Sequence, residues 1–134
     1  MLKFNELKSG DLVMVEYDGQ QKEGQVTKLD NNDKKACVLT DDGQEFWYEL
    51  KHLTPIQLDE TQLFKLGFQK EANSDGSAKY LKGAFRVMIF KSDDFSNFEM
   101  WYREDRRLIR QPIYLHDFQN KYLDMTKIPL IKGA

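Results

Sequence analysis

The chain has 134 residues, of which 40% are hydrophobic and 31% are charged, and its formal net charge is −2. This balance suits a soluble globular protein rather than a disordered one. No apolar run approaches the roughly 20 residues of a membrane-spanning helix, and the slight negative charge gives no general attraction to nucleic acid, although a local patch could still bind it.

The sequence favours a cytoplasmic protein with no membrane partner. The first six residues lack the apolar core of a signal peptide, so we do not expect export. Cys37 is the single cysteine and cannot form an internal disulfide, which agrees with a reducing compartment.

Short β-prone runs alternate with turn signals through the first 58 residues, at a spacing of roughly ten residues that is typical of a small all-β barrel. Leu2, Phe4 and Leu7 are expected to form a lead-in that packs across this barrel. The two-residue period breaks between Val26 and Leu29, which predicts a bulge. Strands are expected at residues 11–17, 22–29, 35–40 and 44–50, with turns at residues 18–19, 30–33 and 41–43.

Four short patterns mark this half of the chain: Gly10-Asp11-x-Val13-x-Val15, Gly24-x-Val26, Asp41-x-Gly43 and Leu53-x-Pro55-Ile56. In these patterns the segment 8–58 resembles the SH3-like small barrels, the group that includes KOW and Tudor domains. Tudor domains that read methylated side chains carry aromatic residues in the first loop and beside the Asp-Gly turn. This chain has Gln20, Gln21 and Asp42 at those places, so no aromatic cage is expected.

Residues 59–134 are expected to form an α+β segment. Asp59 can cap a short helix that ends at Gly67. A last helix is expected over residues 115–125, because Leu115, Phe118 and Tyr122 repeat with helical period, as does Leu123. Between the two helices, an antiparallel meander is expected with strands at residues 68–72, 85–90 and 98–102 and around residues 108–109.

A second resemblance rests on the short helix within residues 59–68, which ends in Gly-Phe, and on Leu115-His116-Asp117-Phe118-Gln119-Asn120. With a meander between them, these features are similar to an uncharacterised family of short bacterial proteins that ends in a His-x-x-Gln-Asn helix. The family has no assigned activity, so it supports only the architecture. The predicted fold class is mainly β or α+β: an SH3-like barrel at residues 8–58, packed against an antiparallel meander with two short helices.

No group of residues in the sequence indicates catalysis or a bound metal. A structural zinc site needs four nitrogen or sulfur ligands at close spacing, and Cys37, His52 and His116 are scattered. The acidic pairs fall in expected turns, where Asp is common for backbone reasons, and the phosphate-loop, nucleophile-elbow and zinc-protease motifs are absent. We therefore predict a non-enzymatic protein with no cofactor and no metal site.

Gln119 falls on the apolar stripe of the expected last helix, close to His116 and Asn120. One interpretation makes these residues a polar site facing the sheet. The other, which we favour, is that Gln119 bonds neighbouring backbone and that His116 helps to cap the helix start, because buried polar groups usually find partners of that kind.

The candidate binding surface combines aromatic and basic side chains. Trp47 is a candidate anchor for a protein partner, although coverage by the second half of the chain is the interpretation we favour for it. An arginine cluster follows an aromatic pair and could hold single-stranded nucleic acid, but Glu104 and Asp105 interrupt it and favour a solvated hairpin end. The candidate residues are Tyr17, Trp47, Trp101, Arg103, Arg106, Arg107 and Arg110.

Three functions of different classes remain open from the sequence, the third being a small enzyme with a site at the junction of the two halves. The leading hypothesis is an interaction or adaptor module that binds a protein partner through the barrel loops or the seam between the two halves. The alternative is nucleic-acid binding through the barrel loops and the cluster from Arg103 to Arg110, which predicts salt-sensitive affinity.

Overall fold

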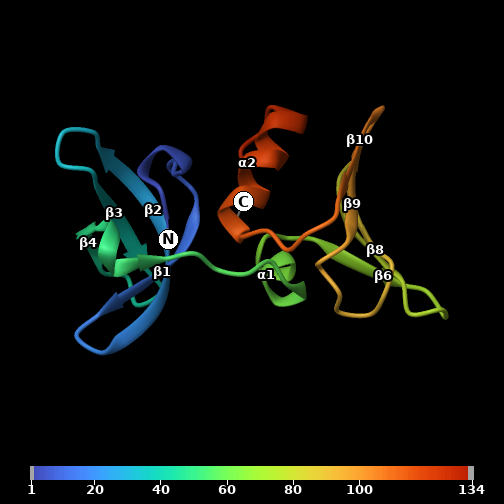
Figure 1. The fold of residues 1–134 in the computed structure, drawn as a ribbon, viewed down its shortest axis with the longest axis horizontal. Helices are drawn as coiled ribbons and strands as arrows, with labels where there is room; N and C mark the ends of the chain where they lie inside the picture. Colours follow the sequence, from blue (N-terminus) through green and yellow to red (C-terminus); the bar gives the residue numbers. More distant parts are fainter. Residues whose placement is uncertain (1, 133–134) are drawn as a thin grey trace. The chain divides into compact units, whose positions relative to one another are not determined.

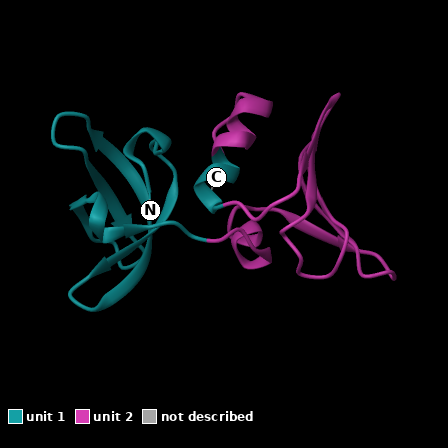
Figure 2. Cartoon of the chain, in the orientation of Figure 1, with its two compact units in different colours: residues 1–56, 114–119 teal, residues 57–113, 120–134 magenta. Residues whose placement is uncertain are grey.

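A computed structural model describes residues 2–132 and divides the chain into two compact units (Figures 1 and 2). Unit 1 comprises residues 1–56 and 114–119, and unit 2 comprises residues 57–113 and 120–134. Each unit contains one five-stranded antiparallel sheet, so the predicted mainly β or α+β fold class is confirmed. Across residues 2–132, no helix has the length and apolar character needed to cross a bilayer.

The sheet of unit 1 follows the strand order β4-β3-β2-β1-β5. Its β1–β2 hairpin turns at Asp18 and Gly19, which both have positive φ, as the expected two-residue turn requires. Closure into a barrel stays a prediction, because this order leaves β4 and β5 as edge strands. The strands are β1 (Leu12–Tyr17), β2 (Gln20–Asp30), β3 (Lys35–Thr40), β4 (Glu45–Glu49) and β5 (Leu53–Thr54).

Two features of β2 shape this sheet. The register against β3 shifts between Val26 and Lys28, which confirms the predicted bulge. Two residues earlier, Gly24 is buried where the neighbouring strand approaches closely: a Cβ atom there would lie 2.5 Å from Cγ1 of Val38. A side chain at this position would therefore force the two strands apart.

The core of unit 1 lies on one face of the sheet and includes Leu2 and Leu7 from the N-terminal lead-in, as predicted, whereas Phe4, the third predicted residue, is only half-buried. These two residues flank a 3-10 turn, η1 (Phe4–Glu6). Asp11 is fully buried beside this core, where it accepts hydrogen bonds from the backbone and the ammonium group of Lys8. Burial raises the pKa of Asp11, and the bonds to Lys8 oppose that shift. The remaining core residues are Val13, Val15, Val26, Ala36, Val38 and Leu53.

Helix α2 (Leu115–Thr126) contributes its first residues to unit 1. Gln119 is fully buried, and its amide bonds the backbone at two points: Nε2 donates to the carbonyl of Gly10 at 2.8 Å, and Oε1 accepts from the amide of Leu12 at 2.8 Å. The interpretation that Gln119 bonds neighbouring backbone is therefore confirmed. Its partners come from the approach to β1, more than a hundred residues away in sequence.

Unit 2 contains a meander with the strand order β10-β9-β8-β7-β6. The predicted helix cap is confirmed, because the Asp59 carboxylate accepts from the amide of Gln62 at 2.9 Å, and Gly67 follows the helix with a φ of 91°. One strand, β7, was not predicted from the sequence. The elements are α1 (Glu60–Lys65), β6 (Gln69–Ala72), β7 (Ala78–Lys82), β8 (Phe85–Ile89), β9 (Phe98–Tyr102) and β10 (Asp105–Ile109), with the second part of α2.

Aromatic rings fill much of the core of unit 2. Tyr122 of α2 lies 4.6 Å from the ring centroid of Phe85 and 6.4 Å from that of Phe68. All three residues are buried. Contacts between offset or edge-on rings stabilise such a core beyond the area they bury.

We expect Gln119→Leu to destabilise the protein. The change leaves the Leu12 amide and the Gly10 carbonyl buried without these partners, at a cost of roughly 1–3 kcal/mol for each group. Urea denaturation followed by circular dichroism measures the loss. Gln21→Leu, at an exposed position on β2, serves as the matched control and should change stability little. Equal stability of the Gln119 variant and the wild type would contradict this role.

Gly24→Ala is expected to lower stability by about 1–3 kcal/mol, because the new methyl group overlaps Val38 and approaches the carbonyl of Leu39. The thermal midpoint of unfolding should fall, whereas Gln21→Ala on the same strand should leave it nearly unchanged. An unaltered midpoint for Gly24→Ala would mean that the strands separate at no cost.

Candidate functional site

An aromatic pocket opens on unit 1, with a volume of about 680 Å³. It is formed by strands β1 to β4 and the 3-10 turn η2 (Leu50–His52). Its wall combines aromatic rings with polar and charged side chains of both signs. The lining residues are Val15, Tyr17, Asp18, Gln20, Lys22, Lys35, Gln44, Phe46, Trp47, Tyr48, Glu49 and His52.

Strand alternation brings several of these rings together. Val15 and Tyr17 share one face of β1, and Phe46 and Tyr48 share one face of β4, because successive side chains of a strand point to opposite faces. The Tyr17 ring meets Tyr48 edge-on with 6.4 Å between the ring centroids. It meets His52 at 5.4 Å, again edge-on.

Three of the lining aromatic side chains remain open to solvent. Tyr17 is 62% exposed, Phe46 is 53% exposed and Trp47 is 49% exposed. About half of the Trp47 side chain is thus accessible on unit 1, and its coverage by the second half of the chain stays a prediction. Exposed aromatic side chains gathered at a concave surface are typical of binding sites for other molecules.

The charges around the aromatic pocket are mixed. Lys22 pairs with Asp42 at 2.7 Å, and Lys35, Asp18 and Glu49 complete the lining charges. The hydrogen bond from Lys22, helped by bonds from the Thr40 hydroxyl and the backbone of residue 44, lowers the pKa of Asp42 to about 2. The pocket therefore carries no strongly positive field.

The other candidate residues lie in unit 2, on β9, β10 and the residues next to them. Trp101 is flanked by its cross-strand neighbours Arg86 and Arg106, whose guanidinium carbons lie 5.1 and 4.6 Å from its ring centroid. The indole nitrogen of Trp101 donates to the carbonyl of Arg103 at 2.7 Å. The Trp101 ring is thus engaged within unit 2.

Two arginines of the cluster are in ion pairs. Arg106 pairs with Glu99 at 2.6 Å, and Arg107 pairs with both Asp105 and Asp124 at 2.9 Å. These carboxylates offset much of the positive charge that the sequence suggested. Arg103 and Arg110 are exposed.

The structure brings together only part of the predicted surface. Tyr17 and Trp47 line one pocket, whereas Trp101 and the four arginines belong to the other unit. Phe46, Tyr48 and His52 complete the aromatic pocket but were not predicted as binding residues. Their alternation in the sequence indicated a strand, and a pocket becomes visible only when β1 and β4 are placed in one sheet.

No family model, curated protein or solved structure matches this chain. The candidate site is therefore defined by its own geometry and chemistry.

We expect Lys22→Gln to raise the pKa of Asp42 from about 2 toward the ordinary value of about 3.9. The lowered native pKa means that ionised Asp42 favours the folded state above the unfolded pKa. This contribution is lost as the pH falls through about 2. Carboxyl carbon NMR titration measures the change, with the exposed Lys28→Gln as the control. An unchanged Asp42 titration in the Lys22 variant would show that the ion pair does not form in solution.

Proposed function

We propose that the protein is a non-enzymatic interaction module whose unit 1 binds a protein partner through the aromatic pocket. The observation that carries this proposal is the accessibility of Tyr17, Phe46 and Trp47 at one concave surface. From the sequence, the segment 8–58, which resembles SH3-like barrels, is expected to bind a protein partner through its loops or the seam between the two halves; we keep the protein partner and assign it to the aromatic pocket.

The composition of the pocket favours a polypeptide as the ligand. Trp and Tyr are enriched among the residues that contribute most to protein–protein binding, because each buries a large area with few rotatable bonds. Around the rings, Lys22, Lys35 and Glu49 offer donors and acceptors for a peptide backbone and its side chains. An apolar centre with a polar surround is the usual anatomy of such an interface.

The same features weigh against nucleic acid as the ligand of this pocket. Phosphate contacts need unpaired positive charge, and Lys22 is paired with Asp42 while Asp18 and Glu49 lie in the same lining. In unit 2, the ion pairs of Arg106 and Arg107 lower the local field in a similar way. We therefore retain nucleic-acid binding as an outcome that the experiment can detect.

The test begins with selection of peptides from a displayed random library on the purified chain. A selected peptide is then titrated against the wild type and single variants by fluorescence anisotropy. Tyr17→Ala and Trp47→Ala should each weaken binding by about 2 kcal/mol, roughly 30-fold, because each removes a large ring from the contact. Phe90→Ala, which removes another exposed aromatic ring, in unit 2, is the matched control and should bind normally.

A second readout uses Trp101→Phe, which leaves Trp47 as the only tryptophan. Saturating peptide should then change the emission of Trp47. Equal peptide affinity of the wild type and both pocket variants would reject the proposal. Salt-sensitive binding of single-stranded or duplex probes at low salt, weakened by changes in the Arg103 to Arg110 cluster, would establish the alternative function instead.

A further inference from the structure

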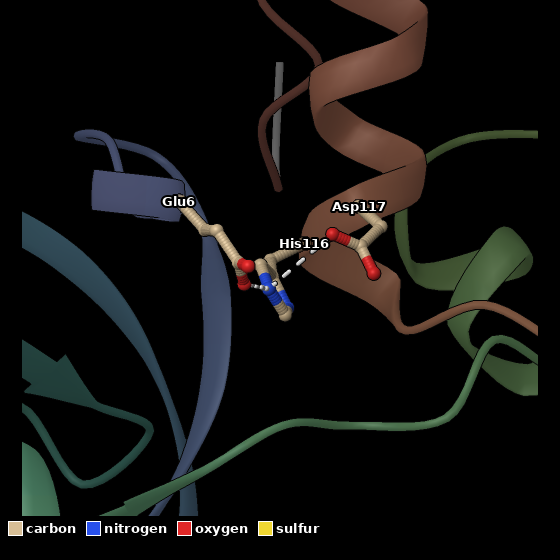
Figure 3. Close-up of side chains that lie close together, drawn as sticks. All are labelled: Glu6, His116 and Asp117. Carbon is tan, nitrogen blue, oxygen red and sulfur yellow. Dashed lines mark hydrogen bonds and ion pairs between the residues drawn. The ribbon is translucent and has the colours of Figure 1, made fainter. Parts of the chain in front are cut away.

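Three side chains from the two ends of the sequence meet in unit 1: Glu6, His116 and Asp117 (Figure 3). Glu6 ends the turn η1, and the other two residues lie in the first turn of helix α2. We propose that these three residues form a site for one Zn²⁺ ion. The site shares no residue with the aromatic pocket, so the inference stands apart from the proposed function.

The distances within the cluster fit shared coordination of one ion. Nε2 of His116 lies 3.4 Å from Oε2 of Glu6 and 3.5 Å from Oδ1 of Asp117. Ligand atoms bound tetrahedrally to zinc, with bonds of about 2.0–2.1 Å, are roughly 3.3 Å apart. The three ligand atoms all lie within 4.8 Å of one another, so a modest rotation of the two carboxylates would complete the arrangement.

The imidazole is buried and therefore held in place, whereas the two carboxylates are partly accessible to solvent. The His116 side chain is 1% exposed, whereas those of Glu6 and Asp117 are 39% and 37% exposed. Figure 3 shows the ring of His116 turned toward both carboxylates. An ion can therefore reach the cluster from solvent and keep water at its fourth position, as zinc sites with three protein ligands do.

Neither neutral tautomer gives both nitrogens of this buried ring a partner. Nδ1 of His116 has no hydrogen-bond partner among the described residues, so the expected capping role of His116 is not seen. A proton on Nδ1 alone would leave the Nε2 lone pair facing two carboxylates, which are acceptors as well. A proton on Nε2 alone leaves Nδ1 as a buried acceptor without a donor. A divalent cation at Nε2 would coordinate the imidazole and both carboxylates at once, with the proton of the neutral ring on Nδ1.

The donor set selects the kind of metal. One imidazole nitrogen with two carboxylate oxygens suits zinc, whereas Mg²⁺ and Ca²⁺ prefer oxygen ligands alone. The absence of thiolate disfavours Cu(I). Binding should weaken as the pH falls, because protons compete with the metal for the ligands.

The test is calorimetric titration of Zn²⁺ into the tag-free 134-residue chain in the presence of excess Mg²⁺. We expect one equivalent of Zn²⁺ to bind and to raise the thermal midpoint of unfolding. Glu6→Gln and Asp117→Asn should each weaken binding at least about tenfold, since losing even an outer-shell partner of a metal ligand costs roughly 10–100-fold. Both positions are partly exposed, and circular dichroism establishes that the variants remain folded.

Glu71→Gln and Asp33→Asn are the matched controls, because they remove the same kinds of carboxylate at exposed positions outside the cluster. Both should bind Zn²⁺ like the wild type. Absence of saturable Zn²⁺ binding would overturn the proposal and leave the cluster as three side chains that contact one another without a metal. Equal affinities of the wild type and both cluster variants would overturn it as well, because the ion would then be held elsewhere.

Discussion

Unit 1 depends on the buried amide of Gln119. Its two hydrogen bonds satisfy the carbonyl of Gly10 and the amide of Leu12, which flank the buried Asp11 at the entry to β1. A buried backbone group without a partner is costly, so the bonds stabilise both the helix position and the path of the chain into the sheet. The same turn of α2 also carries His116, whose imidazole lies beside Glu6. The Gln119 side chain thus holds the start of β1 in place, together with the helical turn that carries His116 of the Glu6, His116 and Asp117 cluster.

The aromatic pocket and the core of unit 1 contain different kinds of side chain. The core of unit 1 is filled by small and medium aliphatic residues such as Val13, Val26 and Val38. Three aromatic side chains of unit 1, Tyr17, Phe46 and Trp47, are left accessible instead. Apolar surface that stays in water forgoes the stabilisation that burial would give. This arrangement is reasonable if a ligand provides the missing burial.

Much of the local structure could be predicted from the sequence, because alternation and turn residues act over a few positions. The β1–β2 hairpin, the bulge in β2 and the Asp59 cap all follow from such signals. Strand β7 could not be predicted, since only Ala78 and Tyr80 are buried in its five residues. Of the aromatic pocket, Tyr17 and Trp47 were identified individually.

The remaining site residues depend on long-range pairing. The approach of Glu6 to His116 joins positions 110 residues apart, and no spacing in the sequence reports it. The charge of the arginine cluster also depends on a residue that is distant in sequence. The sequence already shows Glu104 and Asp105 interrupting the four arginines, but the carboxylates that neutralise Arg107 also include Asp124 of α2, which only the fold brings near. Charge patterns in a sequence therefore overstate a patch when its counter-ions are distant along the chain.

The division of unit 1 into residues 1–56 and 114–119 has a consequence for biosynthesis. A ribosome releases the five strands of its sheet long before it releases Gln119. Until then, the Gly10 carbonyl and the Leu12 amide lack their helical partner, and closing a loop of this length carries an entropic cost before the bonds form. The nascent sheet therefore lacks these two bonds until Gln119 has been translated.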